Sequence, residues 1–505
     1  MKKFLSMLVF AGMVASFVAC DDDEGTPDGP SITAPAVTNV QASAAADISF
    51  AVTSPGGYKS VTISQSGGTA AKKSEPAAGA TSGNIVVTFT AGEGAGAGSV
   101  TIAVTDNNSK TETETAAVNI TEEAVPDIVV VAGLIEEDVT WTADNIYELA
   151  GRVIVNAGAT LTIEAGTVIK GRTGDGANAS ALMIARGGKI EAVGTAENPI
   201  IMTSVLDDIQ PGQTSGTELD VTDRGKWGGL VILGKAPISF SGATEAQIEG
   251  VPAGEPLGLY GGNVSDDNSG TVQFVSIRHG GTELSGGNEI NGLTLGGVGS
   301  GTTISDIEIF ANFDDGVEFF GGSVNVSNIL VSYQGDDGID IDQAYSGTID
   351  GFMVVHGAST NQGLEIDGPE GTDNADGKFT LKNGTLIGHD DVANLADFKS
   401  KAQGTIENVL FSGYAAGKKI MIAASYDGSC NSTSNAYKNL VDGNLEFTDV
   451  QFTTFTVDVY ASSGSCDTAA DDATAAGLVS SGTATGGPAI STWGWSVSAD
   501  QGLLE

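Results

Sequence analysis

The sequence predicts an all-β protein in which a small β-sandwich precedes a long parallel β-helix. Three observations lead to this prediction. Glycine is abundant (71 of 505 residues), and short apolar runs separated by Gly, Asn, Asp and Thr continue from about residue 150 to the end. No stretch shows the 3.6-residue apolar spacing of an amphipathic helix. One strand–bend–strand pattern recurs along the chain, as expected for a repeat architecture.

The first residues indicate export. A basic MKK start precedes an apolar run, FLSMLVFAGMVASFVA, that is too short to span a membrane as a helix. The tetrapeptide FVAC at residues 17–20 resembles a lipobox, where a signal peptidase cleaves before a cysteine that carries lipid. The resemblance implies that residues 1–19 are a lipoprotein signal peptide. It also implies that Cys20 is the lipid attachment site, through which several acyl chains would anchor the protein stably.

Residues 20–35 predict a flexible acidic tether. The segment DDDEGTPDGP directly after Cys20 is rich in Asp, Gly and Pro and offers little apolar surface to bury. An acidic run at this place resembles the export signal of surface lipoproteins of the Bacteroidota type. By this resemblance, the lipid anchor holds the protein in the outer membrane, where it faces the cell exterior.

Residues 36–122 predict a small immunoglobulin-like β-sandwich. Runs such as ISFAVTS, NIVVTFTA and SVTIAVTD alternate apolar and polar residues with a period of two, and turn residues separate them. The unit lacks the Cys–Trp–Cys pattern of true immunoglobulin domains. We interpret it as a spacer between the lipid and the main domain. The expected boundary is Val125-Pro126, which places the β-helix at residues 126–505.

A repeated unit carries the β-helix prediction. Six copies, among them TISDIEIF from residue 303 and TIENVLFS from residue 405, place an Asn, Asp or Gly between two short apolar strands. These residue types tolerate a left-handed backbone, so each copy predicts a strand, a one-residue bend and a second strand. The unit resembles the bend between two of the three sheets in pectate-lyase-like proteins, which implies a right-handed parallel β-helix. The bend column consists of Asp306, Asn328, Gly351, Asn383, Asn408 and Asp449.

Stacked coils leave open edges at both ends of a β-helix, and these edges need covering. We expect VTWTADNIYEL (residues 139–149) to cap the N-terminal end. We expect ISTWGWSV (residues 490–497), with its two tryptophans, to cap the C-terminal end.

The charge balance limits the partners. With 22 Lys+Arg against 64 Asp+Glu the formal net charge is −42. Such a chain repels nucleic acid and anionic lipid surfaces and attracts divalent cations, so no nucleic-acid partner is expected. Besides Cys20, the cysteines are Cys430 and Cys466, both in Gly/Ser-rich loops. In an exported chain these two most simply form one disulfide.

Acidic residues repeat on the strand that follows each bend unit. The segments ANFDDGVEFF, QGDDGIDID and TNQGLEID align so that three pairs of residues, beginning at 314, 336 and 361, hold equivalent places, and Asp390-Asp391 is the expected fourth pair. Apolar residues alternate with the acids and should point inward, which leaves the acids stacked on the outer face of neighbouring coils. We call the following set the acid ladder: Asp314, Asp315, Glu318, Asp336, Asp337, Asp340, Asp342, Glu365 and Asp367.

Such a ladder is unfavourable unless something relieves it. Neighbouring coils lie about 4.8 Å apart, and two carboxylates at that distance repel by about 3 kcal/mol at an effective dielectric near 20. Protonation or a bound Ca²⁺ would relieve the repulsion. Ion pairing is not favoured, because no arginine follows Arg278 and none is expected on that face. Three interpretations stay open: a calcium site, a solvated acidic face, or catalytic carboxylates.

The ladder also carries a resemblance. In pectate-lyase-like β-helices the corresponding strand and turn build the binding cleft, aspartates there bind Ca²⁺, and an Arg or Lys abstracts a proton from an acidic polysaccharide. The candidate bases are then Lys399 and Lys401 in ADFKSK. Inverting polygalacturonases use carboxylates on adjacent coils with Gly-His-Gly and Arg-x-Lys motifs. Here GDD and His356-Gly357 are similar while Arg-x-Lys is missing, so His356 is a further candidate. The resemblance places the metal on Asp314, Asp315, Asp336, Asp337, Asp340 and Asp342.

Residues 133–505 further resemble a group of surface β-helix lipoproteins, through segments such as KWGGLVILGKAPI and NEINGLTLGGVGSGT. We therefore expect a lipid-anchored cell-surface protein that binds a cation, with Ca²⁺ as its cofactor, and a glycan or another surface polymer. The alternative is a calcium-dependent polysaccharide lyase or glycoside hydrolase that acts on acidic polysaccharide.

Overall fold

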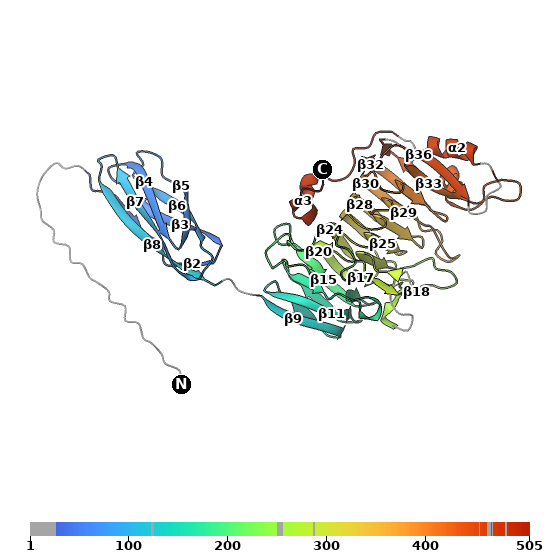
Figure 1. Ribbon diagram of the computed structural model, residues 1–505, viewed down its shortest axis with the longest axis horizontal. Coiled ribbons are helices and arrows are strands. Elements are labelled where there is room, and N and C mark those ends of the chain that lie inside the picture. The colour runs from blue at the N-terminus through green and yellow to red at the C-terminus, as the bar shows by residue number, and fades with distance from the viewer. Residues whose placement is uncertain are drawn as a thin grey trace, which may run out of the picture. The chain divides into compact units, whose positions relative to one another are not determined.

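The computed structural model describes residues 27–122, 126–249, 256–285, 288–453, 455–461, 466, 468–479 and 482–504. The expected signal peptide, Cys20 and the first part of the tether (residues 20–26) lie outside these residues. The chain divides into two compact units, Met1–Val125 and Pro126–Glu505 (Figure 1). Within the described residues, helices that could cross a membrane, judged by their length and apolar character, are not found.

The first unit is a β-sandwich. Two four-stranded sheets enclose one core, in which Phe50, Phe89 and Ile102 are fully buried. The period-two pattern explains this arrangement, because alternate residues of each strand point to the same face. A β-sandwich is present, but it begins at β1 (Ser31–Thr33), so the predicted tether of residues 20–35 ends too late. The immunoglobulin-like type stays a prediction. One sheet is β1 (Ser31–Thr33), β3 (Ala45–Thr53), β6 (Ser82–Ala91) and β5 (Gly68–Ser74), and the other is β2 (Thr38–Gln41), β8 (Thr111–Thr121), β7 (Gly96–Asp106) and β4 (Tyr58–Ser66).

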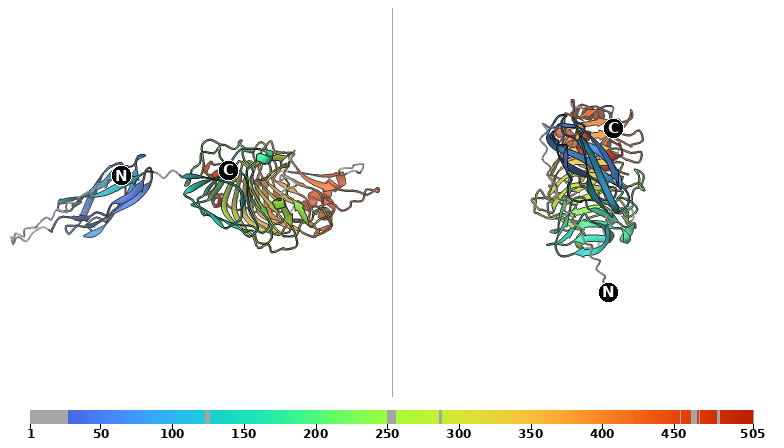
Figure 2. Two further views of the ribbon diagram at one scale, coloured as in Figure 1. Left: turned by 90° about the horizontal axis from the view of Figure 1, so that it is seen from below. Right: turned by 90° about the vertical axis from the view of Figure 1, so that its left-hand side faces the viewer.

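The second unit confirms the predicted fold class, a right-handed parallel β-helix. Its 24-stranded sheet consists of parallel pairings, and the strands stack coil upon coil along one axis (Figures 1 and 2). The pairings separate into three faces, here called sheets I, II and III. Six strands pass from sheet I through the bend into sheet II: β20 (Gly270–Arg278), β24 (Thr303–Phe310), β26 (Asn325–Ser332), β28 (Thr348–Val355), β30 (Phe379–Ile387) and β32 (Gly404–Ser412).

The remaining strands complete the three sheets. Sheet I adds β10 (Val139–Trp141), β12 (Thr160–Ile163), β15 (Lys189–Val193) and β34 (Leu445–Thr448). Sheet II adds the first half of β11 (Asn145–Val155), β13 (Val168–Gly171), β16 (Ile200–Ser204) and β35 (Gln451–Phe452). Sheet III contains the second half of β11, β14 (Ala181–Ile184), β17 (Leu230–Leu233), β23 (Leu293–Gly296), β25 (Val317–Phe320), β27 (Ile339–Asp342), β29 (Leu364–Ile366), β31 (Ala396–Phe398), β33 (Lys419–Ala424) and β36 (Thr456–Ala461).

Short elements lie between the coils. Two small hairpins leave the stack, β18 (Glu245–Gln247) with β19 (Leu259–Gly261) and β21 (Glu283–Ser285) with β22 (Asn288–Glu289). The 3-10 turns are η1 (Gly176–Asn178), η2 (Pro256–Gly258) and η3 (Ile490–Trp493).

The bend column is confirmed. All six predicted residues have positive φ, between 51° and 81°, and Phe274 (φ 49°) occupies the same place one coil earlier. A left-handed backbone costs a residue with a Cβ about 1–2 kcal/mol. Side chains of neighbouring coils compensate by hydrogen bonding to one another. Asn328 Nδ2 donates to Asp306 Oδ1 at 2.9 Å, and Asn408 Nδ2 donates to Asn383 Oδ1 at 2.7 Å.

Both predicted caps are wrong in part. Residues 139–149 form β10 and the start of β11, and β9 (Asp127–Ile135) lies beyond them as a further strand paired with β11. At the other end α1 (Ala436–Asp442) and α2 (Ala469–Val479) cover the core, although no helix was expected. The C-terminal segment instead folds back over the middle coils, where Trp493 and Trp495 pack on Met353 of sheet II and α3 (Val497–Asp500) follows (Figure 1).

Candidate functional site

The acid ladder lies on sheet III and on the loops that lead into it from sheet II. The register places Glu318 beside Asp340 and Asp340 beside Glu365 on β25, β27 and β29, as predicted. The alternating apolar residues, such as Ile339 and Leu364, are fully buried in the core. The strand forms despite its acids because its inward side chains complete the stacked core of the β-helix.

A glycine follows each of the first two acid pairs for a steric reason. A Cβ on Gly316 would lie 2.3 Å from a methyl group of Val331, and a Cβ on Gly338 would lie 2.7 Å from one of Val354. The chain therefore needs glycine to turn from the loop into sheet III against the side chains of sheet II. This close packing fixes the backbone on which the acid pairs stand.

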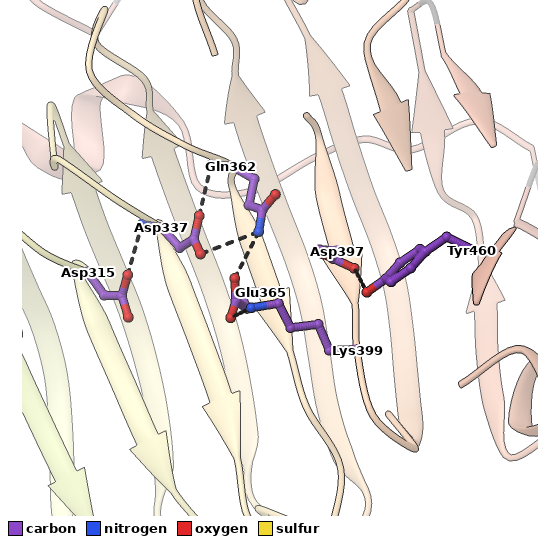
Figure 3. A network of polar contacts seen from close by, with 7 residues as sticks. All are labelled: Asp315, Asp337, Gln362, Glu365, Asp397, Lys399 and Tyr460. Atoms are coloured by element: carbon purple, nitrogen blue, oxygen red, sulfur yellow. Dashed lines mark hydrogen bonds and ion pairs between the residues drawn. The ribbon is translucent and has the colours of Figure 1, made fainter. Parts of the chain in front are cut away.

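The acid pairs stack through the backbone of the next coil (Figure 3). The backbone N–H of Asp337 donates to Asp315 Oδ1 at 2.8 Å, and that of Gln362 donates to Asp337 Oδ1 at 2.8 Å. These contacts confirm the alignment of the first three pairs. The fourth is wrong: Ala393 N donates to Asn361 O, and Asp390-Asp391 precede this position and are exposed.

Four members of the acid ladder are buried. The exposed fraction is 7% for Asp315, 5% for Glu318, 2% for Asp337 and 9% for Asp340. Buried carboxylates lose their hydration, which costs several kcal/mol for an ion without compensation. The interpretation as a solvated face is therefore wrong for these four. The other five members are half-buried: Asp314, Asp336, Asp342, Glu365 and Asp367.

Burial and mutual repulsion shift the pKa values of the ladder upward. Burial is the main cause of the raised pKa of Asp315, Glu318 and Asp340, and neighbouring carboxylates raise it further. Burial, followed by the charge of Asp315, raises the pKa of Asp337 to about 11. The carboxyl groups thus favour protonation or a bound cation over bare ionisation.

In the outer row the shifts have the same direction. Burial, followed by the charge of Asp367, raises the pKa of Asp342 well above its usual range. Burial raises the pKa of Asp367 itself to about 6.

Lys399 supplies one positive charge to the C-terminal half of the ladder. It forms an ion pair with Glu365, which also accepts a hydrogen bond from Gln362 Nε2 at 2.9 Å (Figure 3). The expectation that ion pairing contributes little is therefore wrong at this end. Burial lowers the pKa of Lys399, but the hydrogen bond and charge of Glu365 outweigh it, so the pKa is raised. A lysine with a raised pKa stays protonated at neutral pH, which argues against Lys399 as a general base.

The N-terminal half of the ladder gathers five carboxylates. Oxygens of Asp314, Asp315 and Asp336 lie within 4.8 Å of one another, and so do oxygens of Asp315, Glu318 and Asp340. Carboxylates this close repel one another by about 3 kcal/mol or more at an effective dielectric of 20. This group of five residues is here called the carboxylate cluster.

Two buried oxygens at the carboxylate cluster are unsatisfied. Within the described part of the chain, Asp340 Oδ1 has no hydrogen-bond partner, and neither has Asn291 Oδ1. Asn291 is 1% exposed and its Nδ2 donates to Glu318, so its amide group lies at the cluster. A buried oxygen without a donor is rare, because its desolvation costs about 1–3 kcal/mol. Oxygen atoms of this kind are the ligands that Ca²⁺ prefers.

An open pocket of about 370 Å³ adjoins the cluster. Arg224 reaches it from the long loop between β16 and β17, and its Nε donates to the carbonyl oxygen of Tyr333 at 2.6 Å. The expectation that this face lacks an arginine is therefore wrong. Arg224 precedes the ladder by about ninety residues, and the only signal for it was the unusual length of its loop. The pocket is lined by Arg224, Phe313, Asp314, Gly335, Asp336 and Ser359.

The remaining sequence candidates lie elsewhere. His356 is 3% exposed and its Nε2 pairs with the hydroxyl of Tyr414 at 3.0 Å, and burial lowers its pKa to about 3. It is therefore a neutral interior residue at pH 7. Lys401 Nζ donates to the carbonyl oxygen of Pro369 at 3.0 Å. Cys430 and Cys466 form a disulfide with Cα atoms 5.6 Å apart, beside the helices at the C-terminal end.

Comparison with known proteins identifies a family for the β-helix unit. Residues 133–497 match the pectate-lyase-like β-helix domain family. No curated protein matches the chain. Among solved structures, the family 28 exopolygalacturonase of Yersinia enterocolitica shows 12% identity over 88% of this chain and 90% of its own, with a TM-score of 0.22. The SrpA adhesin of Streptococcus sanguinis shows 18% identity over 21% of this chain and 67% of its own, with a TM-score of 0.17.

These two structural likenesses are too distant to carry an argument about this chain. The family match covers most of the β-helix unit and agrees with its three parallel sheets and bend column. The chain belongs to the pectate-lyase-like β-helix domain family.

Proposed function

We propose that this protein is a lipid-anchored cell-surface β-helix that binds a divalent cation, Ca²⁺, on sheet III, together with a glycan or another surface polymer. The observation that carries the cation part is Asp340 Oδ1, a buried oxygen among buried carboxylates without a hydrogen-bond donor in the described residues. Asp315 and Glu318 offer further oxygens to the same ion. The anchor and the outward location rest on the sequence of residues 1–35.

The donor set fits calcium. Ca²⁺ takes six to eight oxygen ligands at about 2.3–2.6 Å, so ligands of one ion lie up to about 5 Å apart. The oxygens of each carboxylate group lie within 4.8 Å of one another, which agrees with this limit. The cluster offers no sulfur or imidazole ligand, and carboxylate oxygens without such ligands favour Ca²⁺ over zinc. When bound, the ion would supply positive charge to the cleft beside the pocket.

Thermal unfolding tests the cation site. A ligand that binds only the folded state raises the unfolding midpoint, so the midpoint should rise with Ca²⁺ and fall with chelator. Asp340→Asn should abolish most of the Ca²⁺-dependent rise. Asp391→Asn is the matched control, because it removes the same charge from a side chain that is 70% exposed. The proposed cation site would be refuted if Ca²⁺ did not raise the midpoint of the wild type, or if both variants lost this rise equally.

The second candidate function is a calcium-dependent polysaccharide lyase or glycoside hydrolase. The observation that favours it is Arg224, which shares the pocket with Asp314 and Asp336. Incubation with acidic polysaccharides should then release unsaturated or reducing ends, and Arg224→Lys should reduce the rate because lysine lacks the planar guanidinium group. Binding of the polymer without any such ends would favour the binding protein.

A further inference from the structure

We infer that the carboxylate cluster binds two divalent cations that share Asp315 as a bridging ligand. This inference rests on the proposed function and deepens it, because it states how many ions the site holds and which residue couples them. The structural relationship behind it is that Asp315 belongs to both groups of three carboxylates.

Geometry assigns one ion to each group. Within the described residues, the five carboxylates do not form a single group in which all oxygens lie within 4.8 Å of one another. Because the ligands of one Ca²⁺ lie at most about 5 Å apart, two separate groups of carboxylates favour two ions over one. Each group of three fits one coordination sphere. Asp315 has two carboxylate oxygens, which allows it to contact both ions, and shared ligands are found in two-metal sites with ions about 3.5–4 Å apart.

Two ions would also balance the charge of these five carboxylates when all of them are ionised. The five carboxylates carry five negative charges when ionised, and Arg224 in the adjoining pocket supplies one positive charge. One divalent ion leaves two negative charges in a mostly buried cluster, and two divalent ions leave none. Lys399 forms its ion pair with Glu365 in the other half of the ladder, and its charge also acts on Asp340.

Unsatisfied buried oxygens mark the inner ion position. Asp340 is 91% buried and, in the part of the chain that the structure describes, its Oδ1 has no donor. Asn291 adds a neutral oxygen in the same condition beside Glu318. The outer position is lined by Asp314 and Asp336, which border the open pocket. Water from this pocket can complete the outer coordination sphere, as Ca²⁺ commonly requires.

Stoichiometry tests the inference. Isothermal titration with Ca²⁺ at an ionic strength of about 0.15 M, which screens weak binding to exposed acids, should give two tight sites per wild-type chain. Asp336→Asn should retain one site and Asp340→Asn should retain one. Asp315→Asn should weaken both sites at least tenfold. The asparagine keeps an oxygen that can accept the N–H of Asp337, so this variant should still fold, which circular dichroism checks.

Each alternative outcome has a clear meaning. One tight site in the wild type would overturn the two-ion inference and leave the proposed cation binding in place, while no site would refute both. One site of undiminished affinity in Asp315→Asn would overturn the bridge. Should Asp315→Asn fail to fold, Asp336→Asn and Asp340→Asn decide the question. Each of these variants must lose one of the two Ca²⁺ sites and keep the other. Asp391→Asn, the exposed control, should keep both sites.

Discussion

Lys399 and Glu365 form an ion pair across adjacent coils at the point where the acid ladder changes character. On the N-terminal side of this pair lie the buried carboxylates of the cluster, and on its C-terminal side Asp397 accepts a hydrogen bond from the hydroxyl of Tyr460 at 3.0 Å. The ladder thus uses a protein cation at one end. At the other end, the carboxylate cluster offers, in the described residues, oxygens that suit a bound metal cation.

Replacing Lys399 by methionine should destabilise the β-helix unit. Glu365 is 14% exposed at its side chain, so its charge would be left largely unpaired away from water. Hydrogen bonds to charged groups contribute about 1.5–3 kcal/mol, and the partial exposure of Lys399 reduces this to about 1–2 kcal/mol. Urea unfolding measures the change. Lys382→Met is the control, because its pair with Asp350 is more exposed and should contribute under about 1 kcal/mol; equal effects would contradict the argument.

Stability without Ca²⁺ should fall as pH rises. Burial raises the folded-state pKa of Asp337 to about 11, whereas the unfolded value is near 4. The folded state therefore binds more protons between these values, and its stability decreases with pH by up to about 1.4 kcal/mol per pH unit for one such group. The stabilisation is complete below the unfolded pKa and is lost as pH rises towards the folded pKa.

Melting curves between pH 5 and pH 8 in chelator measure this trend. Asp337→Asn should reduce the slope of this trend, because the amide does not titrate, and the other buried carboxyls should maintain the remaining slope. Added Ca²⁺ should stabilise more at pH 8 than at pH 5, since the ion replaces protons on its ligands. A midpoint in chelator that rises over this range would show that the buried carboxyls are ionised in the folded protein.

Glu308 should hold the C-terminal segment, residues 490–504, against sheet II. It is fully buried and accepts hydrogen bonds from Ser498 N at 2.9 Å, Ser498 Oγ at 2.7 Å and Val497 N at 3.1 Å. Glu308→Ala leaves these donors unpaired, at a cost of about 1–3 kcal/mol each where they stay buried. The segment should detach, and chymotrypsin should then cleave after Trp493 or Trp495, as mass spectrometry would show. Glu407→Ala, on the exposed face of β32, should not speed cleavage.

Two substitutions of Asn383 should separate backbone strain from hydrogen bonding. The residue has φ 56°, donates to Asp350 Oδ1 and accepts from Asn408, both at 2.7 Å. Asn383→Gly loses the two hydrogen bonds but tolerates the backbone, as Gly351 does in the same column. Asn383→Ala loses both and adds about 1 kcal/mol of strain. Urea unfolding should therefore rank alanine as the more destabilising, and the reverse order would refute the role given to the bend.

Much of the fold could be predicted because its determinants are local. The left-handed bend requires Asn, Asp or Gly at one place in each coil, and the strands around it require alternation with period two. Both requirements leave a pattern in a single chain. The three aligned pairs, two of them acidic and the third Asn361-Gln362, follow by alignment, since coils of similar length repeat the same places. The prediction for Asp390-Asp391 was wrong because it followed residue type: the equivalent position is Ala393, ten residues after its bend, as Asn361 is in the coil before.

The candidate site was only partly predictable, because it depends on contacts between segments that are distant in the sequence. Arg224 enters the pocket from a loop several coils earlier, and the residues around it show no pattern that would predict its contact with the ladder. The position of the C-terminal tryptophans depends on an apolar surface of sheet II to which Met353 and Val355 contribute. Burial of the ladder depends on the loops around it, and loop paths are set by contacts between distant segments.

The sequence by itself determined that this chain is a β-helix with stacked carboxylates on one face, because steric and hydrophobic requirements act within each coil. Only the tertiary structure decided that Asp315 and Asp340 are buried and that Glu365 is paired with Lys399. It also decided that Arg224 lies beside Asp314. Desolvation and charge pairing depend on which segments meet in space, and those two effects give a row of acids its chemistry.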